Sequence, residues 1–143
     1  LMHMQGEPRT MQKNPVYTDL LSEVKSFLAE RARALTDLGV SAEKIVLDPG
    51  FGFGKTVSQN FELLAKTEDF LSLGYPLLYG MSRKSSLGAV TGITKAEERL
   101  ISSVTAHLLA VERGASIVRV HDVKQMKEAL TIYKAMVHYK DLK

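Results

Sequence analysis

The sequence predicts an α/β protein built from parallel βα units, and two observations lead to this prediction. Short apolar runs without polar alternation, typical of buried strands, alternate with longer segments whose apolar residues recur at helical spacing. Each short run is followed at once by a polar or glycine-rich cluster. Because a parallel neighbour needs a crossover connection, strands joined through helices run parallel. Four such units of roughly 35–40 residues suit either a small open sheet or half of a (β/α)8 TIM barrel, whose usual length is about 250 residues.

The first residues of the chain favour the half-barrel. Leu1–Met4 has the character of the second half of a strand that is already leaving a core, without a cap or a polar lead-in. We therefore expect that a segment preceding Leu1 is missing. Residues 1–143 would then form a single domain that is incomplete, with four βα units present.

The predicted elements follow from apolar periodicity and from helix-start and helix-stop residues. They are a loop over Gln5–Pro15, a helix over Tyr17–Leu38, a strand over Lys44–Asp48, a helix opening at Thr56, a strand over Pro76–Gly80, a helix from Thr94 to Gly114, a strand over Ser116–Val120 and a helix over Val123–Val137. Thr56 with Gln59 forms a capping-box pattern at the start of the second helix. Thr94 with Glu97 should form another at the third helix, and Asp122 should cap the last.

Composition excludes several classes of protein. The 143 residues are 45% hydrophobic and 24% charged, which is ordinary for a globular domain. The net charge is +3 with scattered basic residues, so we expect no nucleic-acid partner. Cysteine is absent, which excludes disulfides and thiolate metal sites. No apolar run approaches the ~18 residues of a membrane span, and the first residues do not resemble a signal peptide, so we expect a cytoplasmic protein with no membrane partner.

The stretch Lys44–Thr56 (KIVLDPGFGFGKT) contains the most informative residues. Asp48 ends a buried strand and precedes a loop of one proline and three glycines, whose bare backbone allows a flat ligand to come close. A carboxylate accepts two parallel hydrogen bonds, so Asp48 suits an amidine-like edge such as that of a pterin or guanine. Of the two loop phenylalanines, Phe51 and Phe53, we favour Phe53 as the one that covers the ligand. The alternative is that Asp48 only caps the following turn.

A second polar cluster, Ser82–Lys84, follows the strand Pro76–Gly80. Lys84 offers one compact cation with three donors, which could bind a ring carbonyl or nitrogen or neutralise a leaving group. A solvated turn is the alternative interpretation. Since the carboxyl ends of parallel strands share one edge, this cluster should lie near Asp48.

A third cluster contains Arg119 and His121 at the end of the last strand. Arg119 lies within an otherwise apolar strand, where a buried arginine needs a partner. That partner could be Asp122 or Asp48. We prefer an anion site formed by Arg119, His121 and the N-terminus of the last helix, whose backbone N–H groups favour phosphate.

Two competing interpretations are weaker. Gly54-Lys55-Thr56 matches the end of a nucleotide-binding P-loop, but Pro49 stands where the first glycine is needed and supplies no N–H group. The remaining histidines, at positions 3, 107 and 138, suit structural or surface roles better than catalysis. No His, Asp or Glu grouping has clear metal-ligand spacing.

Four motifs in this order, LMHMQGEPRTMQ, LDPGFGFGK, GMSRKS and RVHDV, closely resemble the C-terminal half of the dihydropteroate synthase family. The resemblance extends from Leu1 to about Met136. It implies an eight-stranded (β/α) barrel in folate biosynthesis that is a target of sulfonamides. The implied reaction joins 4-aminobenzoate to a dihydropterin diphosphate and releases pyrophosphate with Mg2+.

The resemblance also implies residue roles. Asp48 would bind the 2-amino and ring N–H edge of the pterin, and Lys84 would hold its carbonyl side and border the aminobenzoate pocket. Arg119 and His121 would bind the departing pyrophosphate, which makes them, with Lys84, the catalytic residues. Further residues would border the substrates, namely Met2, Phe53, Gly80 and Ser82.

The chain departs from the family in lacking the first four strands, which supply an Asp, two Asn and two mobile loops. We therefore expect Mg2+ to be held mainly by the substrate diphosphate and by residues outside this chain. We also expect the chain alone to be inactive, and the family resemblance implies a homodimer through the C-terminal helices. A non-catalytic pterin- or methyltetrahydrofolate-binding module is the alternative, and a P-loop nucleotide-binding protein is a less favoured one.

Overall fold

The computed structural model describes residues 1–7, 9–11 and 13–141, and it confirms alternating helices and parallel strands. The helices are α1 (Leu20–Asp37), α2 (Val57–Ala65), α3 (Ser85–Thr91), α4 (Leu100–Glu112) and α5 (Val123–Val137). Short 3-10 turns are η1 (Ala42–Lys44), η2 (Thr67–Leu73), η3 (Ala96–Glu98) and η4 (Tyr139–Asp141). The regular strands are β1 (Leu78–Tyr79) and β2 (Ile117–Val118). Two residues of the predicted loop, Pro8 and Gln12, lie outside the described residues.

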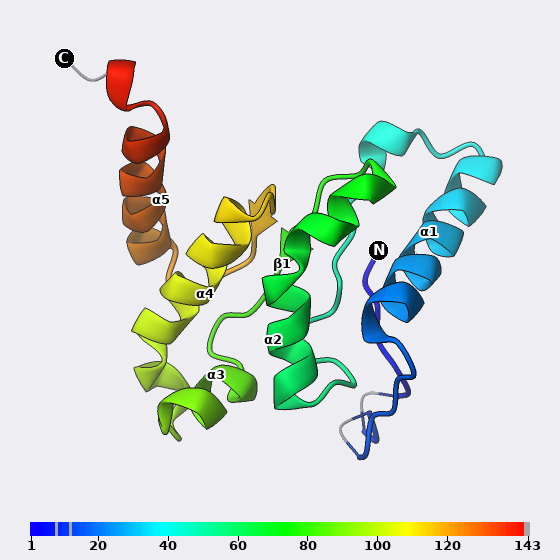
Figure 1. Ribbon diagram of the computed structural model, residues 1–143, viewed down its shortest axis with the longest axis horizontal. Coiled ribbons are helices and arrows are strands. Elements are labelled where there is room, and N and C mark those ends of the chain that lie inside the picture. The colour runs from blue at the N-terminus through cyan, green and yellow to red at the C-terminus, as the bar shows by residue number, and fades with distance from the viewer. Residues whose placement is uncertain (8, 12, 142–143) are drawn as a thin grey trace.

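Four chain segments pair in parallel, each with its neighbour in the sequence. The first pairs with the segment before the glycine loop, that segment pairs with the one leading into β1, and β1 pairs with β2. The paired residues are Met2 with Asp48, Leu47 with Leu77, Leu78 with Ile117, and Tyr79 with Val118. Helices α1, α2, α4 and α5 follow one another across the molecule in the same order (Figure 1). This is the predicted arrangement of four βα units.

The regular strands are shorter than the apolar runs suggested. Lys44, predicted as the first strand residue, is the last residue of the η1 turn. Backbone hydrogen bonds nevertheless connect the segments: the Asp48 N–H donates to the Leu1 carbonyl at 2.8 Å, and the Leu47 N–H donates to the Pro76 carbonyl at 2.9 Å. The four predicted strands are therefore present as a short ladder.

Helix α2 begins where the sequence predicts it, because its capping residues are close together in the sequence. Thr56 and Gln59 form the predicted capping box, with Oγ1 of Thr56 accepting from the Gln59 N–H at 3.2 Å. The predicted box of Thr94 and Glu97 is wrong, because α4 begins only at Leu100. The intervening residues form η3, and the guanidinium of Arg99 donates to the Thr94 carbonyl instead.

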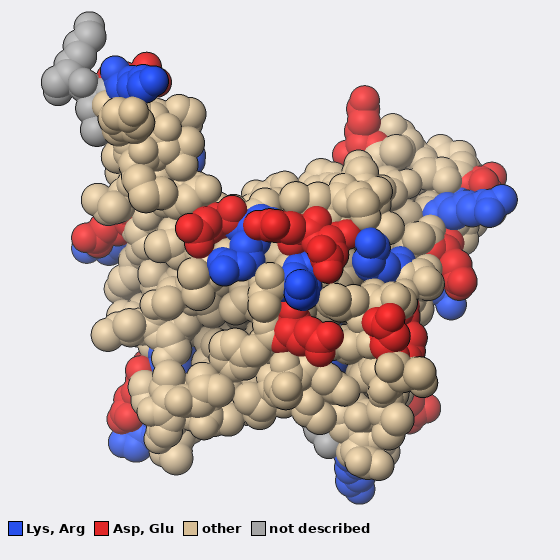
Figure 2. Space-filling model, in the orientation of Figure 1, with Lys and Arg blue, Asp and Glu red and all other residues tan. Residues whose placement is uncertain are grey.

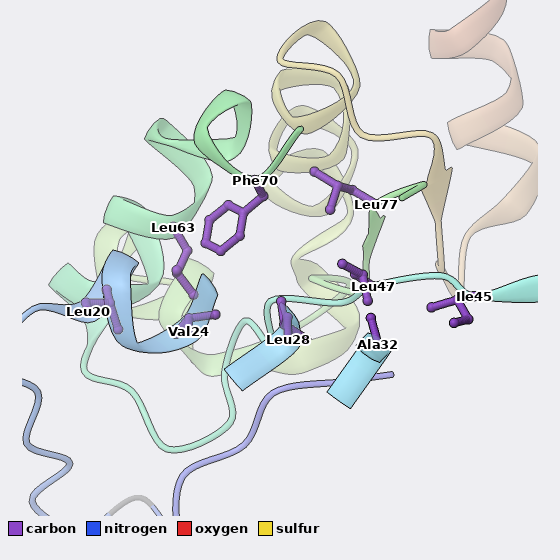
Figure 3. Packing of buried hydrophobic residues seen from close by; sticks show 9 residues of the cluster. All are labelled: Leu20, Val24, Leu28, Ala32, Ile45, Leu47, Leu63, Phe70 and Leu77. Carbon is purple, nitrogen blue, oxygen red and sulfur yellow. The ribbon is translucent and has the colours of Figure 1, made fainter. Parts of the chain in front are cut away.

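Two hydrophobic clusters lie behind the strand ends. The first packs α1 and α2 against the strand segments, and its side chains point toward one another in Figure 3. Its members are Leu20, Val24, Leu28, Ala32, Ile45, Leu47, Leu63, Phe70 and Leu77. The second cluster includes side chains of α2, α3 and α4. Its members are Phe51, Leu64, Tyr79, Met81, Leu87, Ala106, Ala110 and Ala115.

The buried Tyr79 connects β1 with the helices around it. Its side chain is fully buried, and its hydroxyl donates to the Leu63 carbonyl at 2.9 Å and lies 3.0 Å from the Thr67 hydroxyl. These hydrogen bonds fix β1, which precedes the Ser82–Lys84 cluster, to α2 and η2. Among the described helices, none is long and apolar enough to cross a membrane.

Replacing Leu63 by alanine should lower the free energy of unfolding by about 2–5 kcal/mol, because the side chain is fully buried and leaves a cavity. The matched control is Leu38→Ala, whose side chain is 82% exposed, and its effect should stay within about 0.5 kcal/mol. Urea unfolding followed by circular dichroism measures both. Equal losses in the two variants would contradict this description of the core.

Candidate functional site

Five of the residues predicted from the sequence line a single pocket of about 260 Å³ at the carboxyl ends of β1 and β2. These residues are Gly80, Ser82, Lys84, Arg119 and His121, and Val120 completes the wall. The second and third polar clusters therefore meet, as the parallel arrangement predicted. Their side chains come from two neighbouring βα units.

Lys84 joins this pocket to the glycine loop. Its Nζ donates to the Phe51 carbonyl and lies 4.1 Å from the centre of the Phe53 ring. A Cβ at Gly52, whose φ is +82°, would come within 2.7 Å of the Lys84 side chain, so the close approach requires glycine. Burial lowers the pKa of Lys84 to about 8, while the nearby Asp48 carboxylate opposes this shift.

The two loop phenylalanines take different environments. Phe51 is 1% exposed and packs into the second cluster, whereas Phe53 is half-buried beside the Lys84 amino group. This division agrees with the choice of Phe53 as the ring that covers a ligand, although its contact with a ligand stays a prediction.

Asp48 is buried, and it combines the two roles considered for it. Its Oδ1 accepts a hydrogen bond from the Gly50 N–H at 2.8 Å, which is the turn-capping role. Within the described part of the chain, no hydrogen bond to Oδ2 is found, and its contact with a ligand stays a prediction. Burial raises the pKa of this carboxyl, and the positive charges of Lys84, Arg119 and Lys55 oppose the rise.

Arg119 is more exposed than its place in an apolar strand suggested, and among the described residues it has no acidic partner of its own. Its residue is exposed rather than buried, because β2 lies at the edge of the described sheet and the pocket opens there. Its guanidinium packs over Gly80, where a Cβ would come within 2.9 Å of Nη2. No ion pair of Arg119 is found among the described residues, since Asp122 pairs with Arg83 instead.

His121 is held against the neighbouring unit. Its backbone N–H donates to the Ser82 Oγ at 3.2 Å, and its Nδ1 lies 2.9 Å from the same oxygen. Ser82 therefore connects the end of β1 with the end of β2 at the pocket. Met2, the remaining predicted contact, is 37% exposed, and its backbone pairs with Asp48.

The prediction that the Asp122 side chain caps α5 is wrong. Asp122 occupies the N-cap position, but its side chain accepts no capping hydrogen bond. Its two carboxylate oxygens accept instead from Arg83, with Nη2–Oδ1 at 2.7 Å and Nε–Oδ2 at 3.2 Å. A bidentate guanidinium is a stronger partner than a backbone N–H group.

Sequence reasoning missed Asn60, which is fully buried in α2. Its Oδ1 accepts from the Gly52 N–H at 2.6 Å, while its Nδ2 donates to the Thr56 carbonyl at 2.8 Å and to the Ser86 Oγ at 3.0 Å. The glycine loop is thereby fixed to α2 and α3. An amide placed among Phe61, Leu63 and Leu64 was the available signal.

Lys55 is 3% exposed and turned into the protein. Its Nζ donates to the carbonyls of Gly50 and Phe53, each at 3.0 Å, and lies 2.9 Å from Nδ1 of His3. Burial lowers the pKa of Lys55 to about 7 and that of His3 to about 4. These contacts occupy the amino group that a P-loop would direct at a phosphate, so the structure speaks against that alternative.

His107 has the structural role expected for it. The ring is fully buried, its Nε2 accepts from the Met81 N–H at 3.0 Å, and its Nδ1 lies 2.7 Å from the Ser103 carbonyl. These partners fix the neutral tautomer with the proton on Nδ1, and burial lowers the pKa. His138 lies on the surface.

Comparison with known proteins decides the family. The model of the family described as pterin binding enzyme matches residues 1–121. The chain belongs to this pterin-binding enzyme family. It is 44% identical over 143 residues to the dihydropteroate synthase of Escherichia coli strain K12, covering all of this chain and 50% of that protein.

Solved structures of dihydropteroate synthases are also similar to this chain, and two of them serve as examples. One is the dihydropteroate synthase of Stenotrophomonas maltophilia with imidazole bound in its active site, at TM-score 0.94 and 51% identity over 96% of this chain and 52% of the other. The second is the Xanthomonas albilineans enzyme in complex with 7,8-dihydropteroate, at TM-score 0.89 and 43% identity over 96% and 50%. The chain therefore spans about half the length of these relatives.

The buried Lys55 should make stability depend on pH. Its folded-state pKa of about 7 lies below its ordinary value of 10.5, so the unfolded chain binds more protons between these values and stability rises with pH there. We expect the free energy of unfolding to gain about 1 kcal/mol from this residue between pH 7 and 8.

The measurement is urea unfolding at pH 7.0, 7.5 and 8.0. Lys55→Met should be less stable and should lose most of this rise, whereas Lys44→Met, a change at an exposed lysine, should keep it. The same pH dependence in Lys55→Met and in the unmodified chain would show that Lys55 is not the titrating group.

Proposed function

We propose that this chain supplies half of the active site of a dihydropteroate synthase. The reaction condenses 4-aminobenzoate with 6-hydroxymethyl-7,8-dihydropterin diphosphate to give 7,8-dihydropteroate and pyrophosphate, a step of folate biosynthesis. The observation that carries the proposal is the pocket in which Lys84, Arg119 and His121 meet beside Asp48 and the glycine loop. The 7,8-dihydropteroate bound to the Xanthomonas albilineans relative supports the same product here.

The pterin would lie between Asp48 and Lys84. Oδ2 of Asp48 would accept from the 2-amino and ring N–H edge, and the Lys84 amino group would donate to the carbonyl side. Phe53 and Met2 would cover the faces of the ring. The charges favour this placement, because Asp48 is close enough to Lys84 and Arg119 for their positive charges to act on its pKa.

The diphosphate would bind at Arg119 and His121. Among the described residues the Arg119 guanidinium has no ion pair of its own, and the pocket beside it is open to a ligand. As the methylene C–O bond breaks, its electron pair leaves with pyrophosphate, whose charge these residues stabilise. The aminobenzoate nitrogen, held near Ser82 and Lys84, then forms the C–N bond and releases its proton to solvent. No covalent enzyme intermediate is required.

Magnesium cannot be assigned to residues of this chain. The described residues contain no cluster of three or more His, Cys, Asp or Glu side chains that could hold a metal ion. An Mg2+ ion would have to be held by the substrate diphosphate and by residues of the other half of the barrel. We further propose a cytoplasmic protein, and we propose that these 143 residues alone are inactive.

The test is a three-component assay with dihydropterin diphosphate, 4-aminobenzoate and Mg2+, performed on the complete barrel that contains this chain. Arg119→Ala should weaken binding of the pterin diphosphate at least about tenfold more than binding of the bare pterin, because one charge-assisted contact is lost. Asp48→Asn is the matched comparison and should weaken both ligands alike, because a donor then faces the ring N–H groups.

Calorimetric titration measures both ligands. Equal losses of the two ligands in Arg119→Ala would contradict the anion site. Tight pterin binding without turnover that depends on 4-aminobenzoate would identify a non-catalytic pterin- or methyltetrahydrofolate-binding module instead. The same assay on the 143-residue chain tests its inactivity.

We also propose that the protein forms a homodimer through its C-terminal helices. An apolar pocket of about 270 Å³ lies between α2, α3 and α4, and another of about 220 Å³ lies between α4 and α5, with Leu109 in both walls. Large apolar side chains beside them are exposed, namely Ile101, Ile132 and Met136 at 80%, 68% and 60%. Figure 2 shows few charged side chains over α3 and α4. Contiguous exposed apolar surface of this kind marks interfaces.

Ile101→Asp should shift the protein from dimer to monomer, because a carboxylate would be buried without a partner at the interface. Leu38→Asp, at an equally exposed apolar residue near the end of α1, should leave the dimer intact. Sedimentation velocity of the complete barrel measures both. A dimer that persists in Ile101→Asp would rule out this face.

A further inference from the structure

We propose that Arg83 is a positioning residue that shields the anion site from the negative charge of Asp122. The inference rests on the proposed function, because it takes Arg119 and His121 as the groups that bind the diphosphate. It concerns an ion pair between two successive βα units, Arg83 after β1 and Asp122 at the start of α5.

Arg83 points away from the pocket although both of its sequence neighbours line it. Ser82 and Lys84 are pocket residues, whereas Arg83 is not and reaches Asp122 instead. Its φ of +60° is unusual for a residue other than glycine. This left-handed conformation turns the backbone between the two pocket residues and directs the guanidinium toward α5.

The backbone of Arg83 is held on both sides. Its N–H donates to the Ser103 Oγ at 2.8 Å, and its carbonyl accepts from Nη1 of Arg99 at 2.9 Å. Arg99 also donates to the Ile93 carbonyl at 2.9 Å, so α4 and the segment before it fix this turn. A strained conformation persists when its surroundings over-determine it, and it is then a sign of function.

Asp122 is the reason that a cation is needed at this place. It directly follows His121 in the sequence. The hydrogen bond with Arg83 is the main cause that lowers the pKa of Asp122, and the nearby His121 side chain adds a smaller contribution. Left alone, its carboxylate would repel a diphosphate bound at His121 and Arg119. The bidentate contact with Arg83 occupies both carboxylate oxygens and leaves those two residues to act on the ligand.

The pair also holds the two halves of the pocket together. Arg83 fixes the strand end that carries Ser82 and Lys84, and Asp122 fixes the one that carries Arg119 and His121. The only other side-chain hydrogen bonds between these strand ends in the described residues are those of Ser82 with His121. The ion pair is partly exposed, so its contribution to overall stability should be small while its effect on the anion remains.

The test is calorimetric titration of the complete barrel with inorganic pyrophosphate and, separately, with the bare pterin. Arg83→Gln should weaken pyrophosphate binding about tenfold, the scale of one unit charge roughly 10 Å away at an effective dielectric constant near 20. Binding of the bare pterin should change by less than about twofold, because that ligand carries no charge for Asp122 to repel. Arg33→Gln, which breaks an exposed Arg–Asp pair on α1, is the matched control and should change neither.

Two further variants separate shielding from a merely structural brace. Arg83→Gln with Asp122→Asn should recover most of the pyrophosphate affinity, since the repelling charge is gone. Arg83→Lys should also retain most of it, because the charge remains although the bidentate contact is lost. A double variant no better than Arg83→Gln would overturn the proposal, as would equal losses of both ligands in Arg83→Gln.

The proposed function has its own distinct outcome in this experiment. If the unmodified complete barrel binds the pterin but not pyrophosphate, the anion site itself is wrong and the shielding role is overturned with it. If the unmodified barrel binds both ligands and Arg83→Gln behaves like Arg33→Gln, only the shielding role is overturned.

Discussion

The parallel pairing of successive chain segments is the constraint on which the rest of the structure depends. Each segment bonds to the next one along the chain, from Leu1 and Met2 through Asp48 to β1 and β2. All four therefore end at the same edge. Residues that are far apart in the sequence, such as Asp48 and Arg119, come close enough for their charges to interact. The helices behind this edge hold it in place through Tyr79 and the two apolar clusters.

The charged groups at this edge are fixed in position, and two of them, Lys84 and Arg119, line the open pocket. Asp48 is buried among three cations, one of which, Lys55, is fully occupied by carbonyls and by His3. Lys84 has one backbone acceptor and two aromatic neighbours, Phe51 and Phe53, and it faces the pocket. Asp48 and Lys84, unlike Lys55, thus have fixed positions but an incomplete set of partners. Such preorganised groups stabilise charge that develops in a reaction without having to reorient.

Much of this could be predicted because the signals are local. Asp48 and the glycine loop are adjacent in the sequence, and so are Thr56 and Gln59, whose capping box the structure confirms. The strand order and the meeting of the polar clusters follow from the βα rhythm alone.

What could not be predicted depends on tertiary partners. The guanidinium of Arg99 takes the Thr94 carbonyl, and α4 starts later than the local pattern indicated. Asp122 is paired with a residue 39 positions away, and the role of Asn60 depends on Gly52 and Ser86. Helix α3 was not predicted, because its first residues, Ser85 and Ser86, are polar and directly follow the Ser82–Lys84 cluster. Its stability depends on a tertiary contact, since the buried Leu87 belongs to the second cluster.

The neighbour-to-neighbour order of the strands has a consequence for how the chain is made. Every strand pair in the described chain joins segments that are adjacent along the sequence, so within this half of the barrel no pair has to wait for a distant segment. Loop closure is needed only within one βα unit at a time, which limits its entropic cost. During synthesis on the ribosome, each unit can dock on the one before it as soon as it emerges. The anion-binding end, which needs β2, is then completed after the end of the site that contains Asp48.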